Sequence, residues 1–156
     1  MLLGVVSDTH RDECTIKKVI EEFKNFDMVI HLGDNVEDAE VLRENLKEKV
    51  IFVRGNCDIG SKNPLELIEI VEGNKIFITH GHKYNVKNTL SNLLYRAQEL
   101  DAQIVLFGHT HVSEIEFEQG IWMINPGSAA LPRDMHSSVA IIEIQQENIN
   151  ASIKLI

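Results

Sequence analysis

Two histidines separated by one residue, His109 and His111, follow a mostly apolar run at 103–107 and a single glycine. A run of that length, rich in β-branched side chains, predicts a buried strand, and the glycine turns the chain directly after it. In a tight turn the two imidazole rings point in different directions, so the pair suits two neighbouring metal ions better than one. A lone His-x-His pattern is weak evidence, so its meaning depends on the residues at the ends of the other apolar runs.

Four other apolar runs also end in side chains that bind metals. The five strand ends together carry oxygen and imidazole ligands at Asp8, His10, Asp34, Asn56, Asp58, His80, His82, His109 and His111. In an α/β sheet, ligands bind at the carboxyl ends of the strands, where the loops converge. The sequence therefore predicts that loops from separate parts of the chain meet at one metal site.

The mixture of ligand types favours Mn²⁺, Fe²⁺, Ni²⁺, Co²⁺ or Zn²⁺ over a structural zinc held by thiolates. Seven of these nine residues, all except Asp58 and His82, are candidate metal ligands. Seven exceed what one ion can use, which indicates two divalent ions, with Mn²⁺ as the first choice. Because a carboxylate can bridge two ions, Asp34, which stands alone at its strand end, is the expected bridge. Paired ions about 3.5–4 Å apart are the usual device for hydrolysing phosphate esters.

Each motif has an ordinary structural explanation when it is taken alone. Asp8 suits the N-cap of the following helix, and segments 33–35 and 55–56 have the composition of tight turns. His31 lies within a strand, so a buried structural role is expected for it. His136 lies in a polar loop and is expected at the surface, with contact to substrate as the alternative. The functional interpretation rests on repetition of the pattern at five strand ends.

The elements that must position these residues alternate between strand and helix in the first two-thirds of the chain. Strands are predicted at 2–6, 27–32, 50–53, 65–71, 75–79, 103–107, 113–118, 121–124, 139–144 and 151–156, and helices at about 12–25, 36–46 and 86–100. We therefore expect an α/β fold in a single domain spanning 1–156, with two β-sheets packed as a sandwich flanked by helices. The N-terminal part is expected to be βαβ-like, and the C-terminal part to be antiparallel β, with a turn at 125–128.

Composition limits the location and the partners. The net charge of −9 argues against an extended nucleic-acid surface, which needs clustered Lys and Arg. It allows a small phosphorylated substrate, because bound cations would reverse the local charge. No stretch reaches the ~20 apolar residues that cross a bilayer, and the start lacks the basic segment of a signal peptide. We expect a cytoplasmic protein without membrane association, and exposed strand edges in the C-terminal third are compatible with a homodimer.

The two cysteines, Cys14 and Cys57, form no Cys-x-x-Cys pattern. Both are expected to be reduced thiols, without a disulfide framework. Cys14 falls within a predicted amphipathic helix and is expected in the core.

In type and order these motifs resemble those of the calcineurin-like metallophosphoesterases, and most closely their small, single-domain bacterial and archaeal phosphodiesterase branch. The family pattern is Asp-x-His, Gly-Asp, Gly-Asn-His-Asp or Glu, a later strand-end His, and Gly-His-x-His, and the chain supplies residues 8–10, 33–34, 55–58, 80–82 and 108–111. The resemblance implies the two-sheet sandwich. It assigns one ion to Asp8, His10 and His111 and the other to Asn56, His80 and His109, with Asp34 bridging.

The implied reaction is attack of a metal-bridging hydroxide on the phosphorus of a small phosphodiester, in line with the departing alkoxide. Asn56 is expected to help hold one ion and to contact a phosphoryl oxygen. Asp58 is expected to orient a metal-binding histidine, His80 or His109, through its free ring N–H. His82 is expected to reach the leaving group.

The chain departs from the family pattern at Cys57, where many larger members carry histidine. A thiol with a pKa of ~8.5 is a weak hydrogen-bond donor and a poor acid at neutral pH, so hydrolysis is expected to depend on the metals and on good leaving groups. An amidohydrolase-type site is disfavoured, because it would place His-x-His on the first strand. The main alternative is a non-catalytic interaction scaffold of the same fold, but there the metal-site histidines are incomplete.

Overall fold

Two five-stranded β-sheets pack against each other in the computed structural model, which describes residues 1–46 and 49–156. The first sheet has the order β10-β9-β1-β2-β3, with β1 (Leu2–Val6), β2 (Met28–His31), β3 (Lys49–Phe52), β9 (Ser138–Gln145) and β10 (Asn148–Leu155). The second has the order β4-β5-β6-β8-β7, with β4 (Glu66–Val71), β5 (Asn74–Thr79), β6 (Ile104–Leu106), β7 (Ser113–Glu118) and β8 (Ile121–Pro126). The predicted sandwich is confirmed.

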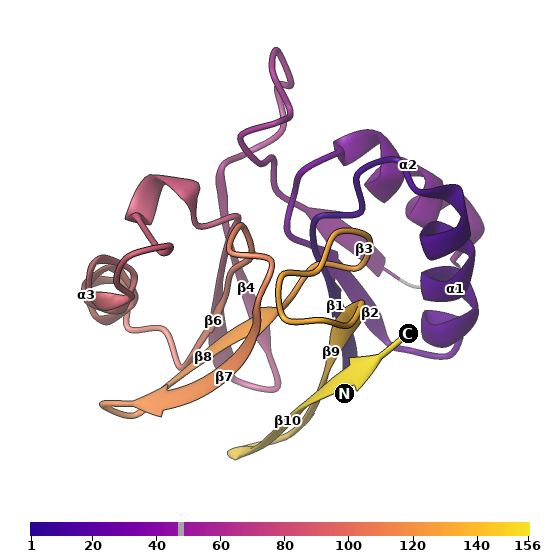
Figure 1. Cartoon of the computed structure of the whole chain (residues 1–156). Coiled ribbons are helices and arrows are strands. Elements are labelled where there is room, and N and C mark those ends of the chain that lie inside the picture. The colour runs from indigo at the N-terminus through magenta and orange to yellow at the C-terminus, as the bar shows by residue number, and fades with distance from the viewer. Residues whose placement is uncertain (47–48) are drawn as a thin grey trace.

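Within residues 1–46 and 49–156, three α-helices flank the sheets, as predicted. Helices α1 (Glu13–Phe23) and α2 (Val36–Asn45) lie beside the first sheet, and α3 (Ser91–Glu99) lies beside the second (Figure 1). A short 3₁₀-helix, η1 (His82–Tyr84), follows β5. Among the described residues, no helix combines the length and the apolar character needed to cross a bilayer.

The main hydrophobic core lies between the sheets, because alternate side chains of each strand point to opposite faces. In β1, Leu3 and Val5 join this central core, whereas Val6 packs in the cluster formed with α1 and α2. A Cβ atom at Gly4 would lie 2.7 Å from the ring of Phe23 in α1, so the missing side chain lets that helix pack directly on the strand.

Each described sheet contains three parallel strands, and the carboxyl ends of five of these six, all except β8, carry the candidate ligands. In the first sheet β2 pairs in parallel with β1 and β3, and in the second β6 pairs in parallel with β5 and β8. The antiparallel C-terminal pairs β7–β8 and β9–β10 are as predicted. The parallel contact of β8 with β6 was not predicted, because it joins segments separated by β7.

Some local predictions were wrong. The third helix begins at Ser91 rather than at residue 86, because residues 85–88 form a turn, in which the N–H of Asn88 donates to Asn85 O at 3.0 Å. Strand β8 continues to Pro126, into the predicted turn, because Pro126 still pairs with Ser113. Cys14 is exposed, because it lies roughly 200° around α1 from the buried Ile16.

Candidate metal centre

The loops after β1, β2, β5 and β6 are joined by hydrogen bonds where the two sheets meet. The backbone N–H of Asp8 donates to Gly33 O at 3.1 Å, and that of Gly108 donates to His80 O at 3.0 Å. A third bond joins the two sheets directly, because the N–H of His109 donates to Asp8 Oδ2 at 3.2 Å. The carboxyl ends of both parallel strand sets therefore face one site.

Two glycines make this close approach possible. A Cβ atom at Gly108 would lie 2.1 Å from Ser7 Oγ, and one at Gly55 would lie 2.0 Å from Asp34 Oδ1. Real Cβ atoms do not approach other atoms so closely, so a side chain at either position would displace a group next to a candidate ligand. Gly55 and Gly108 thus have a packing role, because only the absence of a side chain allows this close approach.

The first group of candidate ligands is Asp8, His10 and His111, whose donor atoms all lie within 4.8 Å of one another. His111 Nε2 is 3.1 Å from Asp8 Oδ1, and His10 Nε2 is 3.5 Å from His111 Nε2. The other ring nitrogen of His111 lies 2.7 Å from Leu131 O, and only a protonated Nδ1 can donate to a carbonyl oxygen. In the neutral ring the Nε2 lone pair therefore faces the Asp8 carboxylate, an arrangement that a cation between them stabilises.

The second group is Asp8, Asp34 and His80, which are all buried. His80 Nδ1 donates to Leu32 O at 2.8 Å, which turns Nε2 toward Asp34 Oδ1 at 3.5 Å. Among the residues that the structure describes, Asp8 Oδ1 and His80 Nε2 are buried without a hydrogen-bond partner. Buried polar atoms normally have a hydrogen-bond or metal partner. A divalent cation would supply the partner that these two atoms lack.

Asp8 belongs to both groups, whereas Asp34 belongs to one. Burial raises the pKa of Asp8, but the neighbouring His111 and His80 rings, when protonated, and the Ser7 hydroxyl bring it down to about 2. Ser7 Oγ donates to Asp8 Oδ2 at 2.6 Å. Asp8 is therefore an ionised, central carboxylate, and the bridging role predicted for Asp34 stays a prediction.

His109 and His82 lie beside His80. The His80 ring centroid is 5.1 Å from that of His109 and 5.4 Å from that of His82. Burial and the positive charge of neighbouring side chains lower the pKa of His109 to about 4, and burial lowers the pKa of His82 as well. Both rings are therefore neutral at pH 7, the form in which imidazole binds metals or accepts a proton.

Asn56 and Cys57 stand at the rim. Both side chains are exposed, and Asn56 Nδ2 lies 3.4 Å from Cys57 Sγ, its one side-chain hydrogen bond among the described residues. The backbone N–H of Cys57 donates to Asp34 Oδ1 at 2.9 Å. Partial desolvation of the sulfur and the nearby Asp34 carboxylate raise the pKa of the Cys57 thiol to about 11, so it is protonated at neutral pH.

Among the described residues Asp58 makes no hydrogen bond to a histidine, and His80 Nδ1 donates to Leu32 O instead, so the contact predicted with His80 or His109 was wrong. Its carboxylate instead accepts four backbone N–H groups, at 2.7–3.0 Å, from Gly55, Asp34, Asn35 and Val36. Helix α2 begins at Val36, and its N-cap residue makes no side-chain cap of its own. Asp58 therefore caps this helix from another loop, an interaction over more than 20 residues that no local pattern reveals.

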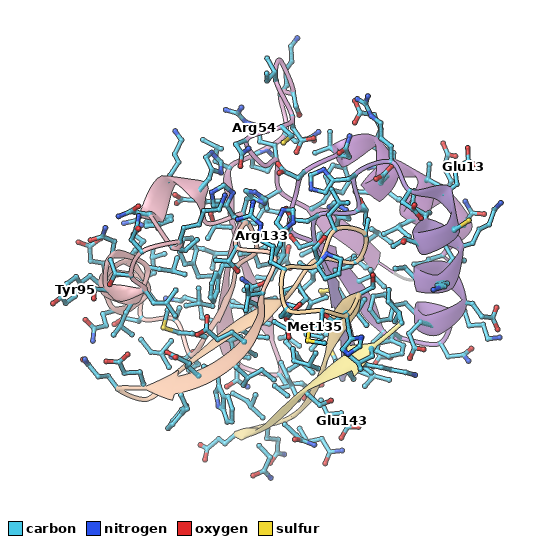
Figure 2. All side chains as sticks on the ribbon, in the orientation of Figure 1. Glu13, Arg54, Tyr95, Arg133, Met135 and Glu143 are labelled. Carbon is cyan, nitrogen blue, oxygen red and sulfur yellow. The ribbon has the colours of Figure 1, made fainter. Side chains whose placement is uncertain are left out.

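Three cations from three different loops surround the histidines, and sequence motifs did not identify them. Arg54 is close enough to lower the pKa of His82, and Lys87 has the same effect on His109. The Asp8 carboxylate raises the pKa of His111, and the positive charge of Arg133 opposes that rise; the backbone N–H of Arg133 donates to His111 O at 2.9 Å. In Figure 2, Arg133 lies near the centre of the view, and Arg54 lies above it at the base of the projecting loop. These three side chains therefore place positive charge beside the candidate ligands.

Comparisons with known proteins agree with this geometry. A family model described as a calcineurin-like phosphoesterase superfamily domain matches residues 1–147. The probable metallophosphoesterase YsnB of Bacillus subtilis is 36% identical over 145 residues, which cover 92% of this chain and 84% of YsnB. Phosphodiesterase MJ0936 of Methanocaldococcus jannaschii is 34% identical over 145 residues, which cover 81% of this chain and 83% of that protein.

Solved structures share the fold along the whole chain. A predicted phosphoesterase from Streptococcus pneumoniae matches 99% of this chain and 88% of its own, with 30% identity and a TM-score of 0.82. Vps29 of Entamoeba histolytica, solved with zinc, matches 100% of this chain and 98% of its own, with a TM-score of 0.81. Its identity of 22% shows the fold alone. From the family model and its relatives, the chain belongs to the calcineurin-like phosphoesterase superfamily.

Proposed function

We propose that this protein is a phosphodiesterase that depends on two divalent cations and hydrolyses a small phosphodiester. The observation that carries the proposal is the pair of ligand groups that share Asp8. The names of the relatives support phosphoester hydrolysis, and that of MJ0936 supports a diester. Mn²⁺ is our first choice, with Ni²⁺, Fe²⁺, Co²⁺ and Zn²⁺ as alternatives, because a mixed imidazole and carboxylate set suits all five.

The residues that would hold the cations divide by position. Asp8, His10 and His111 would hold one, and the other would be held by Asp34, Asn56, His80 and His109. When bound, such cations lower the pKa of a water molecule and neutralise charge that develops on the phosphoryl oxygens.

The chain itself prepares the site in two ways. The carbonyl oxygens of Leu131 and Leu32 fix the tautomers of His111 and His80, so that each Nε2 lone pair is directed inward. Arg54, Lys87 and Arg133 form no salt bridge among the described residues, so their charges are free to attract an anionic substrate. His82 and the Cys57 thiol are the candidate groups beside the leaving oxygen.

The test is a metal-reconstitution assay. The protein is stripped with a chelator, reloaded separately with Mn²⁺, Ni²⁺, Co²⁺, Fe²⁺ and Zn²⁺, and assayed on bis-p-nitrophenyl phosphate and on p-nitrophenyl phosphate. We expect turnover of the diester that disappears with the chelator and returns with metal. The variant His136→Asn, at an exposed histidine outside both groups, is the control and should keep full activity.

The absence of turnover with every metal would contradict the proposal and favour a non-catalytic scaffold. No specific observation favours that alternative now, because the likeness to Vps29 shows the fold alone. A cytoplasmic location and a homodimer formed through strand edges stay predictions, which cell fractionation and light scattering can test.

A further inference from the structure

The loop after β1 has an unusual backbone. Asp8, His10 and Arg11 all have positive φ angles, of 55°, 47° and 60°. Outside glycine this left-handed region is strained, and it persists only where the surrounding structure holds it in place. Contacts elsewhere in the structure must therefore hold this loop in place. They matter for the site because Asp8 and His10 are candidate ligands.

Thr9, which lies between the two ligands and is wholly buried, supplies such a contact. Its Oγ1 donates to Asp38 Oδ2 at 2.6 Å and lies 3.0 Å from His31 Nε2. The backbone N–H of Gly33 donates to His31 Nδ1 at 3.1 Å, so the proton of the neutral ring is on Nε2. His31 Nε2–H therefore donates to Thr9 Oγ1, which in turn donates to Asp38.

Asp38, in the first turn of α2, holds the loop at a second point. Besides the Thr9 hydroxyl, its Oδ2 accepts the backbone N–H of Arg11 at 2.9 Å. The two contacts lie on either side of His10. His31 and Asp38 are both buried, at 0% and 5% exposure, so water does not compete for these hydrogen bonds.

We propose that Thr9, His31 and Asp38 form a positioning relay that holds the Asp8–Arg11 loop in its strained shape and thereby sets the affinity of the site for its cation. The inference rests on the proposed function. Without the relay, Thr9 and Arg11 lose their hydrogen bonds to Asp38, and the backbone of the loop relaxes toward negative φ. His10 then moves away from His111, and the first ligand group loses its geometry.

The direct test is Thr9→Val, which keeps the shape of the side chain and removes its hydroxyl. The measurement is the dissociation constant for Mn²⁺, by calorimetry on chelator-treated protein. We expect binding about 10- to 100-fold weaker, the range found when groups that orient metal ligands are removed. Thr9→Ser retains the hydroxyl and should restore affinity to within about threefold of the wild type.

The chain offers a matched control in Thr15, a second buried threonine whose hydroxyl donates to Ala129 O outside the relay. Thr15→Val should leave Mn²⁺ affinity within about threefold of the wild type. Wild-type affinity in Thr9→Val, or an equal loss in Thr15→Val, would overturn the inference. Asp38→Asn is the second variant if Thr9→Val fails to fold, and unchanged affinity there would also overturn it.

A measurement without metal separates positioning from general destabilisation. In the metal-free protein, the ring resonances of His10 should shift or broaden in Thr9→Val, whereas those of the exposed His136 should not. Unchanged His10 resonances would contradict the relay. If the wild type binds no divalent cation, the proposed function and this inference fail together. If it binds and Thr9→Val binds equally well, only the inference fails.

Discussion

The carboxylate of Asp58 accepts the backbone N–H of Asp34 at 3.0 Å. The same carboxylate accepts the N–H of Gly55 at 2.7 Å, so one side chain joins the loops that follow β2 and β3. Burial raises the pKa of Asp58, but its backbone N–H donors keep that pKa below its ordinary value. Asp58 therefore remains ionised and fixes the backbone from which Asp34 projects.

Asp58→Asn should destabilise the fold by about 2–4 kcal/mol, because the new amide N–H₂ would face backbone donors that it cannot satisfy. Urea unfolding of chelator-treated protein measures this loss. Asp12→Asn is the matched control, since Asp12 caps α1 through a single contact to Thr15 and asparagine is an equally good N-cap. Equal losses in the two variants would show that Asp58 has no special structural role.

The shared carboxylate can be identified by metal counting. Because Asp8 belongs to both ligand groups, Asp8→Asn should reduce bound metal from about two ions to none, with at least about a 100-fold loss of turnover. Asp34→Asn should also lose most of its activity but retain more metal than Asp8→Asn. Elemental analysis of desalted protein gives the stoichiometry. The opposite order of metal retention would assign the bridge to Asp34.

Cys57→His should accelerate the hydrolysis of diesters with poor leaving groups, because the Cys57 thiol, with its pKa raised to about 11, is a poor acid at pH 7. We expect an increase of about tenfold for an alkyl leaving group and little change for p-nitrophenolate. Cys57→Ser, which supplies no acid near neutral pH, is the control. If Cys57→His cleaves both substrates as slowly as Cys57→Ser, the missing acid is not what limits the reaction.

Acid should destabilise the metal-free protein partly through His31. Burial lowers the pKa of His31 from 6.5 to about 4 in the folded state. Between pH 4 and pH 6.5, His31 binds a proton in the unfolded chain but not in the folded chain. The contribution of His31 to the free energy of unfolding is therefore complete above pH 6.5 and falls as the pH drops toward 4. The loss amounts to about 3 kcal/mol. Urea unfolding at several pH values should show that the free energy of unfolding depends less on pH in His31→Gln than in the wild type. Equal pH dependence in the two proteins would show that His31 is not the cause.

The ligand set could be predicted because each ligand directly follows a strand, and strand ends are visible in the sequence. Asp8, His10, Asp34, His80 and His111 were all proposed from this pattern, and the structure brings them into two overlapping groups. The sandwich and the order of its elements were predicted for the same reason, since apolar runs and helical spacing are local signals.

The remaining features depend on contacts between distant segments. Asp58 was expected to orient a histidine, yet it caps α2 across more than 20 residues. Thr9 and Asp38 carry no motif, and only the packing of α2 beside the β1 loop joins them. The parallel pairing of β6 with β8 likewise skips the strand between them. None of these contacts has a periodic signature, so a single sequence cannot reveal them.

Asp8 follows a strand of the first sheet, and His111 follows a strand of the second. A chain whose sheets have separated therefore has no complete site, and a cation held by both residues would bind the native state alone. At 100 times its dissociation constant, such an ion adds about 2.7 kcal/mol to the stability of the protein. Metal supply would then govern how long each molecule survives in the cell, through its resistance to unfolding and proteolysis.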